Sequence, residues 1–182
     1  TGIWKIDKRL NNVIDYTMNI EKTVNSEYGK ETYYNLHNVL EYVEADFKTE
    51  KQYYVSGINC TPETALEEML ITKKQYNKIG GIQGFHAFQS FAEGEVTPEQ
   101  AHTIGVKLAE EMWGDRFEVV VSTHLNTKHY HNHFVINSVS FKDGKRYYDK
   151  RETYAELRRI SDSICEEYGL SKLKEKSCKR SK

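Results

Sequence analysis

The sequence predicts an α+β fold, with an antiparallel or mixed central sheet and helices packed on one of its faces. Two strongly apolar segments, 117–124 and 131–139, follow each other across a short polar loop, as the two strands of a hairpin do. Elsewhere, short apolar segments are separated by stretches whose apolar residues have helical spacing. Some strands therefore follow each other directly in a hairpin, and others are separated along the chain by a helix. This arrangement is typical of the α+β class.

The first half of the chain predicts two strands and three helices. Thr61 and Pro62 have the residue types of an N-cap and a first helical position, and Gly80-Gly81 interrupts the chain afterwards. In order, we expect a strand at 2–6, a helix at 8–18, a helix at 33–46, a strand at 53–57 and a helix at 62–77.

The second half carries stronger boundary signals. Thr97-Pro98-Glu99-Gln100 has the pattern of a capping box, and the helix that it begins ends near Gly114. Gly169 has the place of a C-cap for the last helix. We expect strands at 82–91, 117–124 and 131–139, a turn at 142–145, a short strand at 146–148, and helices after 97 and at 152–168.

Length and composition are those of one soluble globular domain. The 182 residues suffice for a single core, and 29% of them are charged. We expect a domain at 1–170 and a basic tail at 171–182 that leads to a C-terminal region beyond this sequence. No apolar run predicts a membrane span or a signal peptide. Three scattered cysteines without a C-x-x-C pair favour a reducing, cytoplasmic setting.

The distribution of charge is more informative than its sum. A net charge of −1 does not by itself indicate a nucleic-acid partner. Basic residues nevertheless gather at 142–151, at Arg158-Arg159 and from Lys172 onward. Contacts to a phosphate backbone are one interpretation of these groups, and an ordinary solvated surface is the other. The candidates for phosphate contacts are Arg146, Lys150 and Arg151.

The densest chemical signal is the segment His124-Leu-Asn-Thr-Lys-His-Tyr-His-Asn-His133. Side chains alternate along a strand, so His131 and His133 face the same way. A hairpin brings His124 opposite this pair, and three imidazoles then converge on one point. Three histidine ligands with open positions are what a catalytic metal ion needs. His129 and Asn126 lie in the loop, where a second-shell or DNA-facing role is the more natural one.

Further polar residues lie on strand faces that also carry a histidine. Ser90 lies on the same strand face as His86, and its hydroxyl either contacts a phosphate or is a satisfied core group. His86 is interpreted as a supporting residue beside it. Asn137 ends the face of His131 and His133 and is a candidate second-shell partner. Aromatic residues that could stack on unpaired bases, unless they face the core, are Phe85, Phe88, Phe91, Tyr147 and Tyr148.

The segment from Val120 to Asn137 resembles the third motif of mobilisation relaxases, in the MOB-P group of the HUH endonucleases. Asn12-Val-Ile-Asp-Tyr16, followed by Ile20-Glu-Lys-Thr23, is similar to the first motif of that family. The segment that begins at His86 and the one that begins at Gly94 together resemble the second. The resemblance covers nearly the whole chain in the expected order, and it implies an HUH-endonuclease-like palm.

This resemblance implies site- and strand-specific nicking of DNA at a transfer origin. Tyr16 corresponds to the nucleophile and forms a covalent 5′-phosphotyrosine intermediate before the strands are rejoined, with Tyr33 or Tyr34 as reserve candidates. The implied cofactor is a divalent ion, Mg²⁺ or Mn²⁺ first. The implied partners are single-stranded or hairpin DNA, accessory relaxosome proteins and a coupling protein. The implied location is the bacterial cytoplasm, with export alongside the DNA during conjugation.

The chain departs from the family pattern at two positions. Asn126 and Lys128 stand where relatives carry acidic residues, although the three candidate ligands are present. One alternative is therefore a metal-stabilised accessory domain that binds single-stranded DNA and has altered chemistry. Another is a different HUH enzyme, a transposase or replication initiator, in which the tyrosine usually follows the histidines. A small-molecule metallohydrolase would need a carboxylate near the cluster, and none is present.

Overall fold

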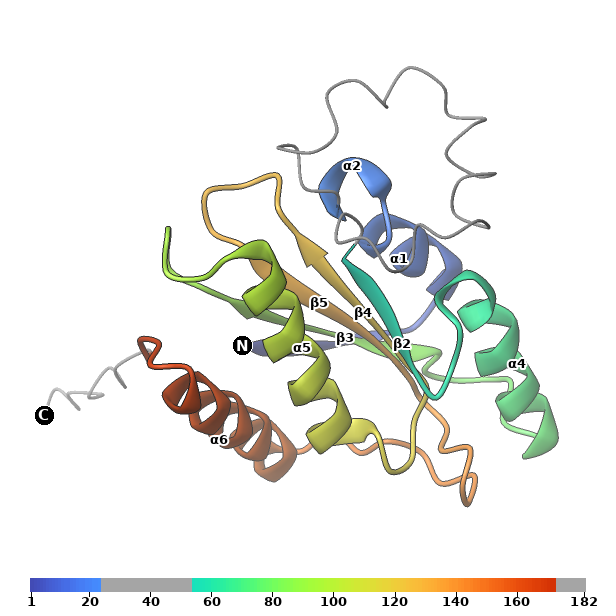
Figure 1. Ribbon diagram of the computed structural model, residues 1–182. Coiled ribbons are helices and arrows are strands. Elements are labelled where there is room, and N and C mark those ends of the chain that lie inside the picture. Colours follow the sequence, from blue (N-terminus) through green and yellow to red (C-terminus); the bar gives the residue numbers. More distant parts are fainter. Residues whose placement is uncertain (24–53, 173–182) are drawn as a thin grey trace, which may run out of the picture.

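A computed structural model describes residues 1–23 and 54–172 of the chain. Its centre is a five-stranded sheet in the order β1-β3-β5-β4-β2, in which every neighbouring pair is antiparallel (Figure 1). The strands are β1 (Gly2–Ile6), β2 (Val55–Ile58), β3 (Gly84–Ser90), β4 (Val119–His124) and β5 (His131–Asn137). The expected α+β class is confirmed, with an antiparallel sheet.

Helices cover both faces of this sheet. The helices are α1 (Leu10–Thr17), α2 (Ile20–Thr23), α4 (Ala65–Gln75), which follows the 3-10 turn η1 (Pro62–Thr64), α5 (Pro98–Trp113) and α6 (Arg151–Glu167). Among these helices, none is long and apolar enough to cross a membrane. Figure 1 shows α5 and α6 together on one face, while α1 and α4 pack against the other.

The expectation that helices occupy one face is therefore wrong. The physical reason lies in the two central strands, where neighbouring residues are apolar on both faces. Val119 and Val121 pack with α5, whereas Val120 packs in the second cluster with residues of α1 and α4. A strand that is buried on both faces reads as a continuous apolar run, and such a run predicts two covering layers.

Most expected boundaries lie within a few residues of the observed ones. Thr97 and Gln100 make both hydrogen bonds of the expected capping box. Gly169 has a φ of 69° after α6, as a C-cap glycine does. The first helix starts later than expected because Arg9 has a left-handed conformation with a φ of 59°.

One further expectation differs from the structure, one helix was not expected, and two expectations fall on residues that the structure does not describe. The expected strand at 146–148 is a single bridge between Val139 and Arg146. The four-residue helix α2 was not expected from the sequence. The expected helix at 33–46 lies outside the described residues, as does most of the expected tail at 171–182. The proposed domain boundary therefore stays a prediction.

A buried hydrogen-bond network closes the end of the sheet where β5 finishes. Lys73 of α4 is fully buried, and its ammonium donates to Oδ1 of Asn137 at 2.6 Å. The Asn137 amide in turn donates to Oε2 of Glu118 at 3.0 Å. Burial lowers the pKa of Lys73 to about 8, because a charged ammonium is costly away from water. The network joins α4 to the two central strands.

Replacing Asn137 by leucine should destabilise the fold, because the buried Lys73 ammonium loses its acceptor. We expect the free energy of unfolding in urea to fall by about 2–4 kcal/mol. The matched control is Asn11→Leu, which makes the same change at an exposed position of α1. Equal losses in the two variants would contradict the assigned role of the network.

A second polar chain runs beneath α5. His102 bonds with Oγ of Ser56 through Nε2 at 2.7 Å and with Oγ1 of Thr123 through Nδ1 at 2.8 Å. Thr123 donates to Asn132, a neighbour that lies close under Gly105 of α5. Burial lowers the pKa of His102 to about 4. The ring is therefore neutral in the folded protein at neutral pH.

This pKa predicts a pH-dependent contribution to stability. An unfolded histidine takes up a proton near pH 6.5, whereas the folded ring resists protonation until about pH 4. The contribution of His102 is thus complete above the unfolded value and is lost as the pH falls from about 6.5 toward 4. Urea unfolding of the wild type and of His102→Gln should differ more at pH 7 than at pH 5. A constant difference would disprove the linkage.

Candidate active site

The pairing of β4 with β5 brings the three candidate ligands together. His124 ends β4 directly opposite His131, the first residue of β5, and Ser122 lies opposite His133. One ligand nitrogen from each of the three histidines lies within 4.8 Å of the others. His124 and His133 are almost fully buried, while His131 is half-buried at the rim. Three imidazoles from two rigid strands form a compact cluster.

Hydrogen bonds orient two of these rings. Nε2 of His124 lies 2.9 Å from the carbonyl oxygen of Thr17, and Nδ1 of His131 lies 2.9 Å from that of His129. A carbonyl oxygen only accepts, so these ring nitrogens carry the protons. The other nitrogen of each ring then has its lone pair free for a ligand. A metal-binding histidine is commonly held in this way.

The third ring supplies an independent sign of a cation site. Nδ1 of His133 lies 2.8 Å from Nε2 of His86. Nε2 of His133 is buried and has no hydrogen-bond partner among the described residues. A buried polar atom without a partner is costly, and a cation held by the three imidazoles would satisfy it. The residues present therefore fit a divalent metal ion.

The electrostatics keep the cluster in its metal-binding form. Burial, together with the neighbouring imidazoles and Lys22, lowers the pKa of His124 to about 4 and that of His133 to about 2. Burial also lowers the pKa of His86. His124 and His133 therefore stay neutral at physiological pH, and neutral imidazole is the form that coordinates metals.

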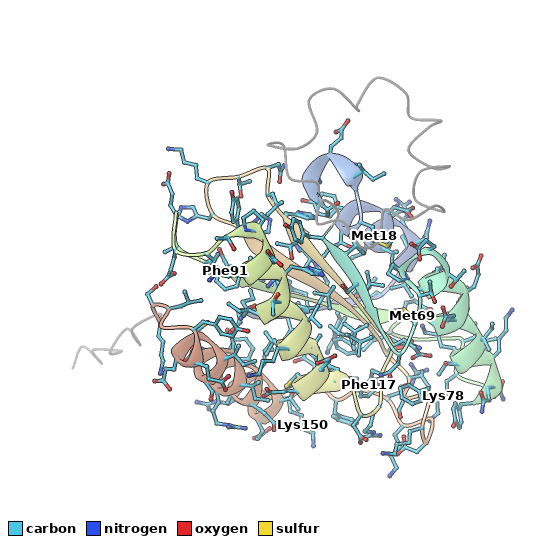
Figure 2. The ribbon with its side chains drawn as sticks, viewed as in Figure 1. Met18, Met69, Lys78, Phe91, Phe117 and Lys150 are labelled. Atoms are coloured by element: carbon cyan, nitrogen blue, oxygen red, sulfur yellow. The ribbon has the colours of Figure 1, made fainter. Side chains whose placement is uncertain are left out.

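Tyr16 lies beside this cluster. Its ring centroid is 5.8 Å from that of His124 and 6.1 Å from that of His133, edge-on in both cases. The side chain is 53% exposed although its helix is docked through Leu10 and Ile14. In Figure 2 the end of this helix, marked by Met18, lies over the same end of the sheet. A phenol is thus held at the rim of a candidate metal site.

Lys22 is a site residue that the sequence alone did not single out. Its ammonium lies 3.4 Å from the centroid of the Tyr16 ring. The carbonyl of Lys22 accepts a hydrogen bond of 2.7 Å from the amide of Leu125, just after His124. The short helix α2 therefore adds a positive charge to the cluster. Its position after Tyr16 in the first motif was the available signal.

The loop between β4 and β5 holds the other predicted residues of the histidine segment. His129 lies outside the triad, with its Nδ1 3.2 Å from the carbonyl oxygen of Phe91. Only its main-chain carbonyl contacts the cluster, through His131. Asn126 and Lys128 are exposed, and Lys128 lies 3.8 Å from Glu93. The two departures from the family pattern thus leave the triad complete.

Two predicted residues on β3 lie next to the cluster. Ser90 is directly opposite His131 and is exposed, so it is not a core serine. His86 contacts His133, as described above. Phe88 lies opposite His133 on the same face, while Phe85 and Phe91 are buried in the core of the α5 side.

Four other predicted residues lie away from the cluster. Asn137 is on the expected face, but its amide belongs to the Lys73 network at the far end of β5. Arg146 donates to the carbonyl oxygen of Gly80 at 2.6 Å and therefore braces a turn. Lys150 and Arg151 begin α6 at this same far end, where Figure 2 labels Lys150. A second-shell role for Asn137 is thus not supported, because β5 carries it away from the histidines.

Comparison with known proteins gives the family. Residues 34–170 match the family model described as "Relaxase: MobA/VirD2-like, nuclease domain". The chain therefore belongs to the MobA/VirD2-like relaxases. The matched range includes the three histidines and begins after Tyr16.

Individual relatives agree with this assignment. Protein rlx of Staphylococcus aureus is 42% identical over 116 residues, which are 64% of this chain and 36% of that protein. The group II intron-interrupted relaxase LtrB of Lactococcus lactis subsp. cremoris is 30% identical over 209 residues, covering 93% of this chain and 36% of that protein. The chain thus spans about a third of the length of these relatives.

The ligand geometry predicts a graded loss of metal affinity. We expect Mn²⁺ titration by calorimetry to detect binding that His133→Ala abolishes. His86→Ala should weaken it by about 10- to 100-fold, because the Nδ1 partner of a ligand is lost. His129→Ala is the control, since it keeps the carbonyl that orients His131. Unchanged affinity in His133→Ala would exclude this ligand set.

Proposed function

We propose that this domain nicks one strand of DNA at a transfer origin, with Tyr16 as the nucleophile. The observation that carries the proposal is the exposed Tyr16 ring, edge-on to two of three clustered histidines. Residues 108 positions apart meet here through the docking of α1 on the sheet. Membership of the relaxase family supports DNA as the substrate.

The reaction is an in-line displacement at phosphorus. The phenolic oxygen of Tyr16 forms a bond to the phosphorus while the bond from phosphorus to the 3′ oxygen breaks. The phenol gives up its proton, and the departing 3′ oxygen takes one up as a hydroxyl. The product is a 5′-phosphotyrosine, which keeps the energy of the phosphodiester. Attack by a 3′ hydroxyl reverses the step and rejoins the strand.

The residues around Tyr16 have distinct tasks in this scheme. His124, His131 and His133 would hold Mg²⁺ or Mn²⁺, which supplies positive charge against the non-bridging phosphate oxygens. Lys22 lies over the Tyr16 ring and adds a second positive charge where negative charge develops. Ser90 lies opposite His131, and the residue is exposed. Its hydroxyl would contact a phosphate of a DNA strand that lies along β3.

The substrate and partners follow from the same proposal. The attacked strand is single-stranded or flanked by a hairpin, as the resemblance to the relaxase motifs implies. Its protein partners would be accessory relaxosome proteins and a coupling protein. The protein would act in the bacterial cytoplasm and leave the cell attached to the DNA.

Covalent trapping tests the nucleophile. In this test, the protein and Mn²⁺ are incubated with overlapping single-stranded oligonucleotides. Together these cover the transfer origin of the genetic element that encodes the protein. We expect a denaturation-resistant adduct with the wild type and none with Tyr16→Phe, because the attacking oxygen is gone. Tyr148→Phe, at another exposed tyrosine, is the matched control.

The remaining outcomes separate the alternatives. An adduct that survives Tyr16→Phe would exclude this nucleophile. Tight binding of these oligonucleotides without an adduct from any of them would identify a binding domain that lacks the chemistry.

A further inference from the structure

We propose that Trp4 and Phe88 form a stacking platform for one unpaired base of the DNA strand, at the sheet edge next to the histidines. The identity of the ligand rests on the proposed function, whereas the platform itself rests on separate residues. Trp4 is 55% exposed, and neither the metal cluster nor the tyrosine chemistry uses it.

The two rings are stacked. Their centroids are 5.1 Å apart and their planes differ by 11°. Trp4 lies in β1, an outer strand of the sheet, directly opposite His86 of β3. Because Phe88 occupies one side of the indole, the large exposed fraction of Trp4 leaves flat apolar surface for a further ring.

The local backbone holds Phe88 in this position. Gly2 is the direct cross-strand partner of Phe88. A Cβ atom on Gly2 would lie only 2.5 Å from Cε1 of Phe88, so the phenyl ring lies across bare backbone. The ring is supported from below by β1 and from the side by Trp4. The platform is therefore built into the sheet rather than carried on a loose side chain.

The platform is continuous with the candidate active site. The ring centroids of Trp4 and His86 are 6.0 Å apart, those of His86 and His133 are 5.0 Å apart, and those of His133 and Tyr16 are 6.1 Å apart. A strand whose phosphate lies at Tyr16 has its neighbouring nucleotides within reach of Trp4. A base is the occupant that this continuity favours over another protein.

The physical role is sequence-tolerant positioning. Every base has a flat π face, so an exposed aromatic pair binds an unpaired base without reading its edge. Loss of one such stacking partner weakens binding by about 5- to 150-fold. Stacking on Trp4 would hold one nucleotide of the DNA strand near the scissile phosphate. In-line attack depends on how this phosphate is aligned with the Tyr16 oxygen.

Intrinsic fluorescence tests the platform directly. The chain has two tryptophans, and Trp113 is only 2% exposed, so quenching by DNA reports on Trp4. In EDTA, we expect single-stranded oligo-dT to quench the wild type and a duplex of equal length to quench it far less. Quenching should persist in Trp113→Phe and disappear in Trp4→Phe.

Affinity measurements complete the test, using anisotropy of a labelled oligo-dT. Trp4→Ala should bind about 5- to 150-fold more weakly. Trp4→Phe keeps an aromatic ring, so its affinity for oligo-dT should stay close to that of the wild type. This variant separates loss of stacking from a folding defect. Ile71→Ala, at an exposed apolar residue of α4, is the matched control and should change nothing.

Failure of the platform is distinguishable from failure of the proposed function. If the wild type forms the covalent adduct while Trp4→Ala binds and reacts unchanged, the platform is wrong and the nicking function stands. If no adduct forms but the quenching and the loss in Trp4→Ala occur, the platform stands alone. An altered oligomeric state of Trp4→Ala with unchanged DNA affinity would indicate a protein interface and overturn the proposal.

Discussion

The antiparallel register between β4 and β5 is the constraint on which the site depends. It sets His124 opposite His131 and leaves His133 two residues further along the same face. A shift of β5 by one residue would turn His131 and His133 toward α5 and leave His124 alone on the other face. The apolar residues of both strands prevent that shift, because Val121 and Phe134 must face one layer while Val120 and Val135 face the other. The core thus specifies the geometry of the cluster.

The features that could be predicted from the sequence are those with a local cause. Strand alternation pairs His131 with His133, a short loop returns the chain to His124, and the capping box at Thr97 starts α5. The continuous apolar runs of β4 and β5 also indicate that both faces of the sheet are covered, although we expected helices on only one face. Each of these signals lies in a few neighbouring residues, so it can be recognised without knowledge of the tertiary structure.

Features that arise from packing between distant segments could not be predicted in this way. The approach of Tyr16 to the histidines requires α1 to dock on the sheet, and only a family resemblance suggested it. Asn137 shares the face of the ligands, yet a buried lysine from α4 claims its amide. The guanidinium of Arg146 contacts the main-chain carbonyl of Gly80, a partner that the sequence did not indicate. The role of a polar residue depends on which distant residue the fold places next to it.

The hydrogen bond from His124 to the carbonyl oxygen of Thr17 joins the tyrosine's helix to a candidate metal ligand. Thr17 is the last residue of α1, directly after Tyr16. Docking of α1 thereby selects the His124 tautomer whose other nitrogen can coordinate, and occupancy of that nitrogen favours the docked helix. Such coupling is reciprocal by thermodynamic necessity. The proposed nucleophile and the candidate metal site would therefore assemble as one cooperative unit, so that a poorly docked Tyr16 would also mean weaker metal binding.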